Sequence, residues 1–225
     1  MHIEEGVVDG AKIRLSYGTA AMSLGLAARM LLHSVQKDGS VLPVAARTVI
    51  TTALVFCFFE LLPHHAVGVS EVHLILGSTL LLMFGAGPAA AGLALGLLVQ
   101  GLFFAPFDLP QYGMNLTTLI VPLWAMGELA KRIIPAGTAY KDVSYGQALA
   151  LSTSYQGGIV VWVGFWSLYG GGLAAENLAS VATFGAAYML VVIVEPLVDL
   201  AVLGIAKSLN GAPRALFVRR LFAAE

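Results

Sequence analysis

The first two residues of the chain, Met1 and His2, hold the nitrogen atoms of a compact metal chelate. The free α-amine, the backbone nitrogen of His2 and the imidazole Nδ1 of His2 can close fused chelate rings on one ion. One further imidazole would complete a square-planar set, a geometry that favours Ni(II) or Cu(II) and is compatible with Co(II). Glu5 could neutralise the bound cation or hold the N-terminal segment in place. The N-terminus therefore predicts a transition-metal site, although a histidine at position 2 can also have no function.

The fourth ligand must come from elsewhere in the chain, and His64, His65 and His73 are the candidates. His64 and His65 follow Pro63 in a loop that we expect to be wet, where a solvated pair is the simpler interpretation. His73 stands at the entrance of a short apolar segment, and an imidazole below a membrane surface is costly unless it is paired or functional. We therefore expect His73 to be the ligand. An interfacial capping role for His73 is the alternative, and His64 or His65 could then replace it.

Four polar side chains inside apolar runs also need an explanation. Gln100 and Asn115 could orient metal ligands through hydrogen bonds, but hydrogen bonds between helices explain them nearly as well. Glu195 and Asp199 are one helical turn apart and flank Pro196. An intramembrane carboxylate is functional by default, whereas a structural polar cluster at a proline kink explains this pair equally well.

The composition is that of an integral membrane protein. Of the 225 residues, 58% are hydrophobic and only 11% are charged, and the mean hydropathy is +0.85. Soluble domains usually carry about a quarter charged residues. The net charge of −1 says nothing about partners, and the absence of a basic stripe predicts no nucleic-acid partner. Residues 1–14 contain no apolar core of a signal peptide, so we expect Met1 to be retained.

Seven apolar stretches predict an all-α bundle of seven transmembrane helices in one domain. Most stretches reach the roughly 20 residues needed to cross a bilayer, but the third is short, which predicts a short helix with a half-buried entrance loop or a re-entrant segment. The stretches are 15–33, 43–62, 72–85, 87–105, 115–134, 146–169 and 177–208. Residues 1–14 then form the metal-binding N-terminal segment, 15–208 the helical bundle and 209–225 a tail.

The positions of the basic residues predict the orientation of the bundle. If all seven stretches cross the membrane, every Lys and Arg except Lys12 and Arg14 falls on one side. The positive-inside rule makes that side cytoplasmic, which places the C-terminus in the cytoplasm and the N-terminus outside. His64, His65 and His73 then share the outer face with Met1 and His2. We expect a multi-pass protein of the cell's inner (plasma) membrane.

The N-terminal sequence Met1-His2-Ile3-x-Glu5-Gly6 resembles that of the CbiM/NikM-type substrate-capture subunits of cobalt and nickel energy-coupling factor transporters. The likeness extends through Ser70-x-x-His73, the Gln100 helix and Gly113-x-Asn115. It implies an N-terminal segment inserted into a seven-helix bundle from outside. It also implies a metal held by the Met1 amine, the amide nitrogen and imidazole of His2, and His73.

The resemblance further implies two kinds of partner, a transmembrane coupling subunit and cytoplasmic ATPase subunits. The chain has no Walker A pattern, so we expect no ATP hydrolysis and no catalytic cofactor of its own. The run from Val72 to Gly77 departs from the family pattern and leaves the fourth ligand and the choice of metal open, with square-planar nitrogen ligands slightly favouring nickel. Two rival classes remain: a membrane metalloenzyme with Glu71 as its base, and a channel or carrier for a substrate other than a metal.

Overall fold

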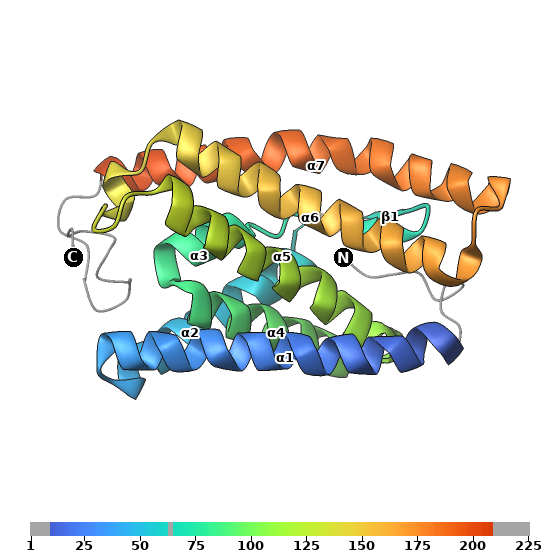
Figure 1. The fold of residues 1–225 in the computed structure, drawn as a ribbon, viewed down its shortest axis with the longest axis horizontal. Helices are drawn as coiled ribbons and strands as arrows, with labels where there is room; N and C mark the ends of the chain where they lie inside the picture. The colour runs from blue at the N-terminus through green and yellow to red at the C-terminus, as the bar shows by residue number, and fades with distance from the viewer. Residues whose placement is uncertain (1–9, 63–64, 209–225) are drawn as a thin grey trace.

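The computed structural model describes residues 10–62 and 65–208, and in these ranges the chain is mostly helical (Figure 1). The helices are α1 (Gly10–Asp38), α2 (Val41–Glu60), α3 (Gly77–Phe84), α4 (Ala86–Phe103), α5 (Tyr112–Ile133), α6 (Tyr145–Gly171) and α7 (Ala175–Ser208). Two 3-10 turns, η2 (Pro106–Gln111) and η3 (Tyr140–Asp142), precede α5 and α6. An antiparallel hairpin of β1 (His65–Val67) and β2 (Ser70–Val72) precedes α3.

Four of the helices, α2, α4, α6 and α7, are long and apolar enough to cross a membrane. Much of their apolar surface faces outward: Val49 on α2 is 69% exposed and Leu190 on α7 is 67% exposed. Such a surface is stable when lipid rather than water surrounds it. The helices α1 and α5 are as long but less apolar, in part because α1 turns Lys12, Ser16 and Ser23 into the protein.

Small residues allow the central helices to approach each other closely. A Cβ atom added to Gly92 on α4 would lie 2.3 Å from Thr51 Oγ1, and one added to Gly96 would lie 2.6 Å from Val55 Cγ1. The Thr51 hydroxyl also donates a hydrogen bond of 2.7 Å to the carbonyl of Pro88. Close backbone approach and hydrogen bonds between helices are the means by which helices associate in lipid. The contact of α2 with α4 therefore needs glycine at both positions.

The two ends of the bundle differ in charge. In Figure 1 the α1–α2 connection, the α5–α6 connection and the end of α7 lie on the left, whereas the hairpin, η2 and the α6–α7 turn lie on the right. In the described chain, the basic side chains other than Lys12 and Arg14 belong to the left end or to the helix portions leading to it: Arg29, Lys37, Arg47, Lys131, Arg132, Lys141 and Lys207. The charge asymmetry predicted from the sequence is thus present along the bundle axis, and its assignment to the two sides of a membrane stays a prediction.

The structure differs from the prediction at one helix boundary and in one additional element. Helix α1 begins at Gly10, so residues 10–14 belong to the helix and not to a separate N-terminal segment. The predicted helix starts later because Lys12 and Arg14 interrupt the apolar pattern. Charged residues can nevertheless belong to a helix. The β1–β2 hairpin is also absent from the all-α prediction. Its strands have only three residues each, too few for a sequence pattern to show.

The third apolar stretch, 72–85, has the first of its two predicted forms, a short helix behind a buried entrance. Only Gly77–Phe84 is helical, and the four residues before it form neither helix nor strand. Among these four, His73 and Ile75 are 1% and 0% exposed. The hairpin lies at the right of Figure 1 and α3 toward the left, so the chain between them runs through the interior.

Candidate metal-binding site

His73 is buried at the point where the hairpin ends and the chain enters the bundle. Its side chain packs edge-on against Phe59 of α2, with the ring centroids 5.5 Å apart and the planes at 80°. Its Nε2 atom lies 2.9 Å from Oε2 of Glu71. A carboxylate at this distance favours the tautomer with the proton on Nε2, so that Nδ1 carries the lone pair. The imidazole thus has the arrangement of a metal ligand that binds through Nδ1.

The hairpin accounts for the pairing of Glu71 with His73. In β2, Glu71 is opposite Ala66 and Val72 is opposite His65. Side chains two residues apart on an extended chain lie on the same face, which brings Glu71 and His73 together. His65 shares the face of Val72 and is exposed. The structure therefore separates the two described histidine candidates, with His73 inside the bundle and His65 on its surface.

Gln100 and Glu60 form a polar contact beside the aromatic neighbour of His73. Gln100 of α4 is 4% exposed, and its Nε2 donates to Oε2 of Glu60 at 3.5 Å. Glu60 is the last residue of α2 and follows Phe59, the residue against which His73 packs. The Oε1 atom of Gln100 is buried and has no hydrogen-bond partner in the described part of the chain. A buried acceptor of this kind needs a donor, so Gln100 is available to orient a ligand.

The other predicted site residues fall into two groups. Asn115 is buried near the start of α5, at the same end of the bundle as the hairpin (Figure 1). Met1, His2, Glu5 and His64 lie outside the described residues. Within 10–62 and 65–208, no three His, Cys, Asp or Glu side chains gather so that they could hold a metal ion.

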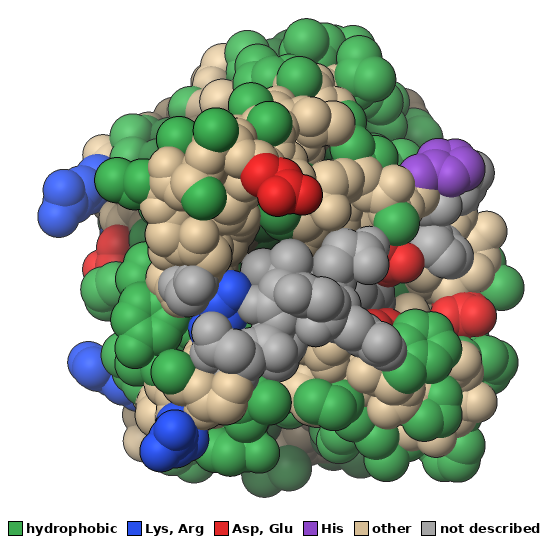
Figure 2. Space-filling view, turned by 90° about the vertical axis from the view of Figure 1, so that its right-hand side faces the viewer, with side chains coloured by type: hydrophobic (Ala, Val, Ile, Leu, Met, Phe, Trp, Pro, Cys, Tyr) green, Lys and Arg blue, Asp and Glu red, His purple; other side chains and the backbone are tan. Residues whose placement is uncertain are grey.

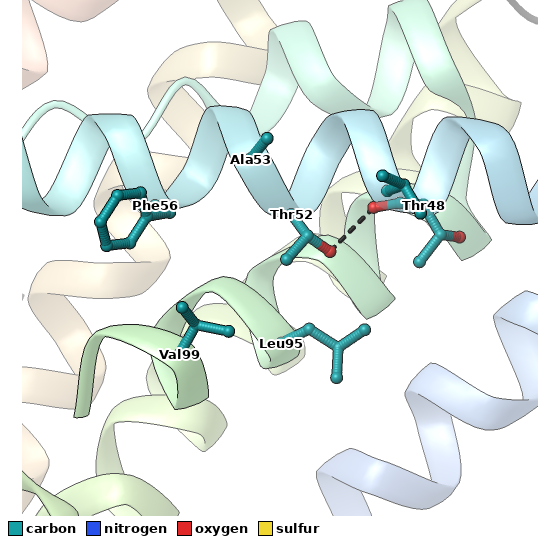
Figure 3. Close-up of a pocket in the computed structure, with 7 residues that line it drawn as sticks. Thr48, Thr52, Ala53, Phe56, Leu95 and Val99 are labelled. Atoms are coloured by element: carbon teal, nitrogen blue, oxygen red, sulfur yellow. Dashed lines mark hydrogen bonds between the residues drawn. The ribbon is translucent and has the colours of Figure 1, made fainter. Parts of the chain in front are cut away.

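A groove of about 390 Å³ between α2 and α4 is a different kind of cavity (Figure 3). Its lining is apolar except for two threonines, whose hydroxyls bond within α2: Thr52 donates to the carbonyl of Thr48, and Thr48 donates to that of Val44. The lining residues are Thr48, Val49, Thr52, Ala53, Phe56, Leu95 and Val99. This set offers no imidazole, thiolate or carboxylate, so the groove is unsuited to a transition-metal ion.

Glu195 and Asp199 form a hydrogen-bonded cluster with the start of α3. Glu195 accepts from the backbone N–H groups of Ile75 and Leu76, and Asp199 accepts from the hydroxyls of Ser78 and Thr79. The pair thus forms a polar cluster, and its partners belong to α3 and the segment before it. Sequence reasoning missed the partners of this cluster, because they lie about 120 residues away in the chain.

The fold and the site define a class: a helical membrane protein with a buried histidine, oriented by a carboxylate, at one end of its bundle. The chain belongs to the CbiM family, whose model, described as the cobalt uptake substrate-specific transmembrane region, matches residues 2–211. No significant match is found among curated proteins or among solved structures. The resemblance to this family is thereby confirmed, and the chain is a substrate-specific membrane component of cobalt uptake.

Proposed function

We propose that the chain captures Co(II) or Ni(II) at the outer face of the inner membrane and passes it to an energy-coupling factor transporter. The ligands are the Met1 amine, the backbone nitrogen and imidazole of His2, and Nδ1 of His73. The observation that carries this proposal is the buried His73 imidazole with its Nε2 at 2.9 Å from Glu71. Metal-binding histidines commonly bond a carboxylate through their second nitrogen, which sets the ring orientation and raises the basicity of the ligand.

The surface at this end of the bundle supports entry of a cation. Figure 2 looks onto the right-hand end of Figure 1 and shows several acidic side chains, together with basic ones, among apolar side chains. Glu71 lies against His73, and Glu60 contacts Gln100. Negative charge at a site attracts cations and raises their local concentration. We further propose that Gln100 and Asn115 orient the ligands, and that Glu5 partly neutralises the ion.

The proposed partners are a transmembrane coupling subunit and cytoplasmic ATPase subunits. The family supports a role as one component of a transport system, and the absence of a Walker A pattern leaves ATP hydrolysis to other subunits. The family description favours cobalt, whereas four nitrogen ligands in a plane favour nickel. Titration of one preparation with both ions determines which binds more tightly.

Adding two alanines before Met1 tests the N-terminal chelate. The extension separates the α-amine from His2 by too many backbone atoms for the fused rings to close, whereas a single added residue would leave the amine, two backbone nitrogens and the imidazole able to form another planar chelate. We expect the affinity for Co(II) and Ni(II) to fall by more than the roughly 10–100-fold that loss of an outer-shell partner costs, because ligands themselves are lost. Competition with a chromophoric chelator, on the full chain in detergent, measures the change.

The matched control is two alanines added after Glu225, which alter the length equally and leave the amine in place. The control protein should bind as tightly as the unmodified chain. An extended N-terminus that keeps full affinity would show that the amine is not a ligand. If the extended protein keeps its affinity and then loses it when His65 is also removed, the result would instead favour a site built from the loop histidines.

A further inference from the structure

The segment between the hairpin and α3 is an irregular backbone inside a buried environment. Ile75 is 0% exposed and Leu76 is 8% exposed. Backbone N–H groups in such a place find no water, so other groups of the protein must accept their hydrogen bonds. The carboxylate of Glu195 on α7 does this for two successive residues: Oε2 accepts from the N–H of Ile75 at 2.9 Å and Oε1 from that of Leu76 at 2.7 Å.

The conformation of Leu76 shows how strongly this arrangement is imposed. Its φ is 51° and its ψ is 37°, the left-handed region, and it is the one non-glycine residue with positive φ in the described part of the chain. A side-chain-bearing residue adopts this conformation only where the surroundings determine it. Successive N–H groups in such a turn converge on an anion. The two oxygens of Glu195 match this need, one for each N–H group.

Glu195 is itself held in place by α6. The amide of Gln156 donates to its Oε1, and the hydroxyl of Tyr188 donates to Gln156 Oε1 at 2.8 Å. Glu195, Gln156 and Tyr188 are each 0% exposed. A side chain with buried partners on each side has little freedom to move, so the carboxylate is a rigid anchor for the segment.

The anchor lies close to the metal ligand along the chain. Ile75 is two residues from His73, a distance of at most about 7 Å of backbone. The hairpin holds the chain on the other side of His73. The position of the imidazole is therefore determined by the hairpin before it and by Glu195 after it.

We propose that Glu195 is a positioning residue for metal capture, which holds His73 in its binding geometry through the backbone of Ile75 and Leu76. This inference rests on the proposed function, since it needs His73 as a ligand. Asp199, one turn further along α7, bonds the side chains of Ser78 and Thr79 and so holds α3 itself. Asp199 lies on the same helix and is also buried, at 4% exposed against 0% for Glu195, which makes it a control for the loss of a buried carboxylate.

Glu195→Gln tests the proposal in the full chain with its native N-terminus. Glutamine keeps the size of the side chain but turns one acceptor oxygen into an NH2 donor, so one of the two N–H groups loses its partner. We expect the Co(II) affinity to fall by at least about 10-fold, the lower range for loss of an outer-shell contact. The ligand-field absorption of bound Co(II) should also change, because it reports the geometry of the ligands.

Asp199→Asn should lower the thermal stability of the metal-free protein while it leaves the Co(II) spectrum unchanged. If Glu195→Gln does not fold, Gln156→Met removes the bond that Gln156 donates to Glu195 Oε1, together with the acceptor of the Tyr188 hydroxyl. It leaves the bonds of Glu195 to Ile75 and Leu76 possible, so it should give the same spectral change with a smaller loss of affinity. Unchanged affinity and spectrum in whichever variant folds would overturn the proposal. Failure of the unmodified chain to bind Co(II) would instead refute the proposed function, so the two failures are distinguishable.

Discussion

Replacing His73 with alanine is expected to reduce the affinity for Co(II) by more than about 100-fold, beyond the range for loss of an outer-shell partner. The substitution removes the one described histidine whose side chain is both buried and bonded to a carboxylate. The three remaining nitrogen ligands would leave an open position on the ion. Equilibrium competition with a chelator, on purified protein in detergent, gives the affinity of each variant.

Two further variants separate ligand loss from damage to the fold. His73→Asn keeps an amide that can donate to Glu71 and occupies more of the space beside Phe59 than alanine does. It should therefore unfold at a higher temperature than His73→Ala while it binds metal equally poorly. His65→Ala changes an exposed side chain of the same hairpin and should bind as the unmodified chain does. The reverse order, with His65 essential and His73 dispensable, would move the fourth ligand to the hairpin surface.

The role of Glu71 predicts an intermediate result in the same assay. Glu71→Gln keeps an oxygen that can accept from His73 Nε2 but removes the negative charge, so the ring stays oriented and becomes a weaker ligand. A loss of affinity between those of His65→Ala and His73→Ala is the expected outcome. An effect as large as that of His73→Ala would indicate that Glu71 binds the ion directly.

Gly68→Ala is expected to destabilise the protein by about 2–5 kcal/mol and to weaken metal binding with it. Gly68 has a φ of 62° in the turn of the hairpin, and an added Cβ atom would lie 2.4 Å from the carbonyl oxygen of Ser180 on α7. The left-handed conformation costs a residue with a side chain about 1–2 kcal/mol, and a forced shift of packed backbone costs about 1–3 kcal/mol. Because the hairpin leads directly to His73, its displacement from α7 should also disturb the site.

The matched control is Gly39→Ala. Gly39 has nearly the same conformation, with a φ of 65°, but an added Cβ atom there meets nothing within 4 Å. Its substitution should cost only the conformational part, about 1–2 kcal/mol, and leave metal affinity unchanged. Thermal unfolding in one detergent, with and without Co(II), compares the two variants. Equal losses of stability would show that packing of the hairpin on α7 contributes nothing.

Much of the helical bundle could be predicted because lipid imposes a simple rule on sequence. A helix that faces hydrocarbon must be apolar along its length, and the four helices that meet this condition correspond to predicted stretches. The prediction was weaker where the rule does not apply. Residues 10–14 are helical but not apolar, and the three-residue strands of the hairpin have no distinctive pattern. The third stretch is predicted to hold a short helix. Its irregular entrance is predicted only from the fact that the stretch is too short to cross the bilayer.

The sequence by itself determined the class of the protein and the identity of its candidate ligands. Composition specified a membrane protein, and the motif at Met1-His2 with His73 pointed to the family that the match over residues 2–211 confirms. Those features are local, since a chelate or an apolar stretch is readable from neighbouring residues. Only the tertiary structure decided which described histidine is buried and what holds it. Glu195 bonds the backbone two residues from His73 across a separation of 120 positions, and hydrogen bonds to backbone N–H groups leave no mark on the sequence of the residues that donate them.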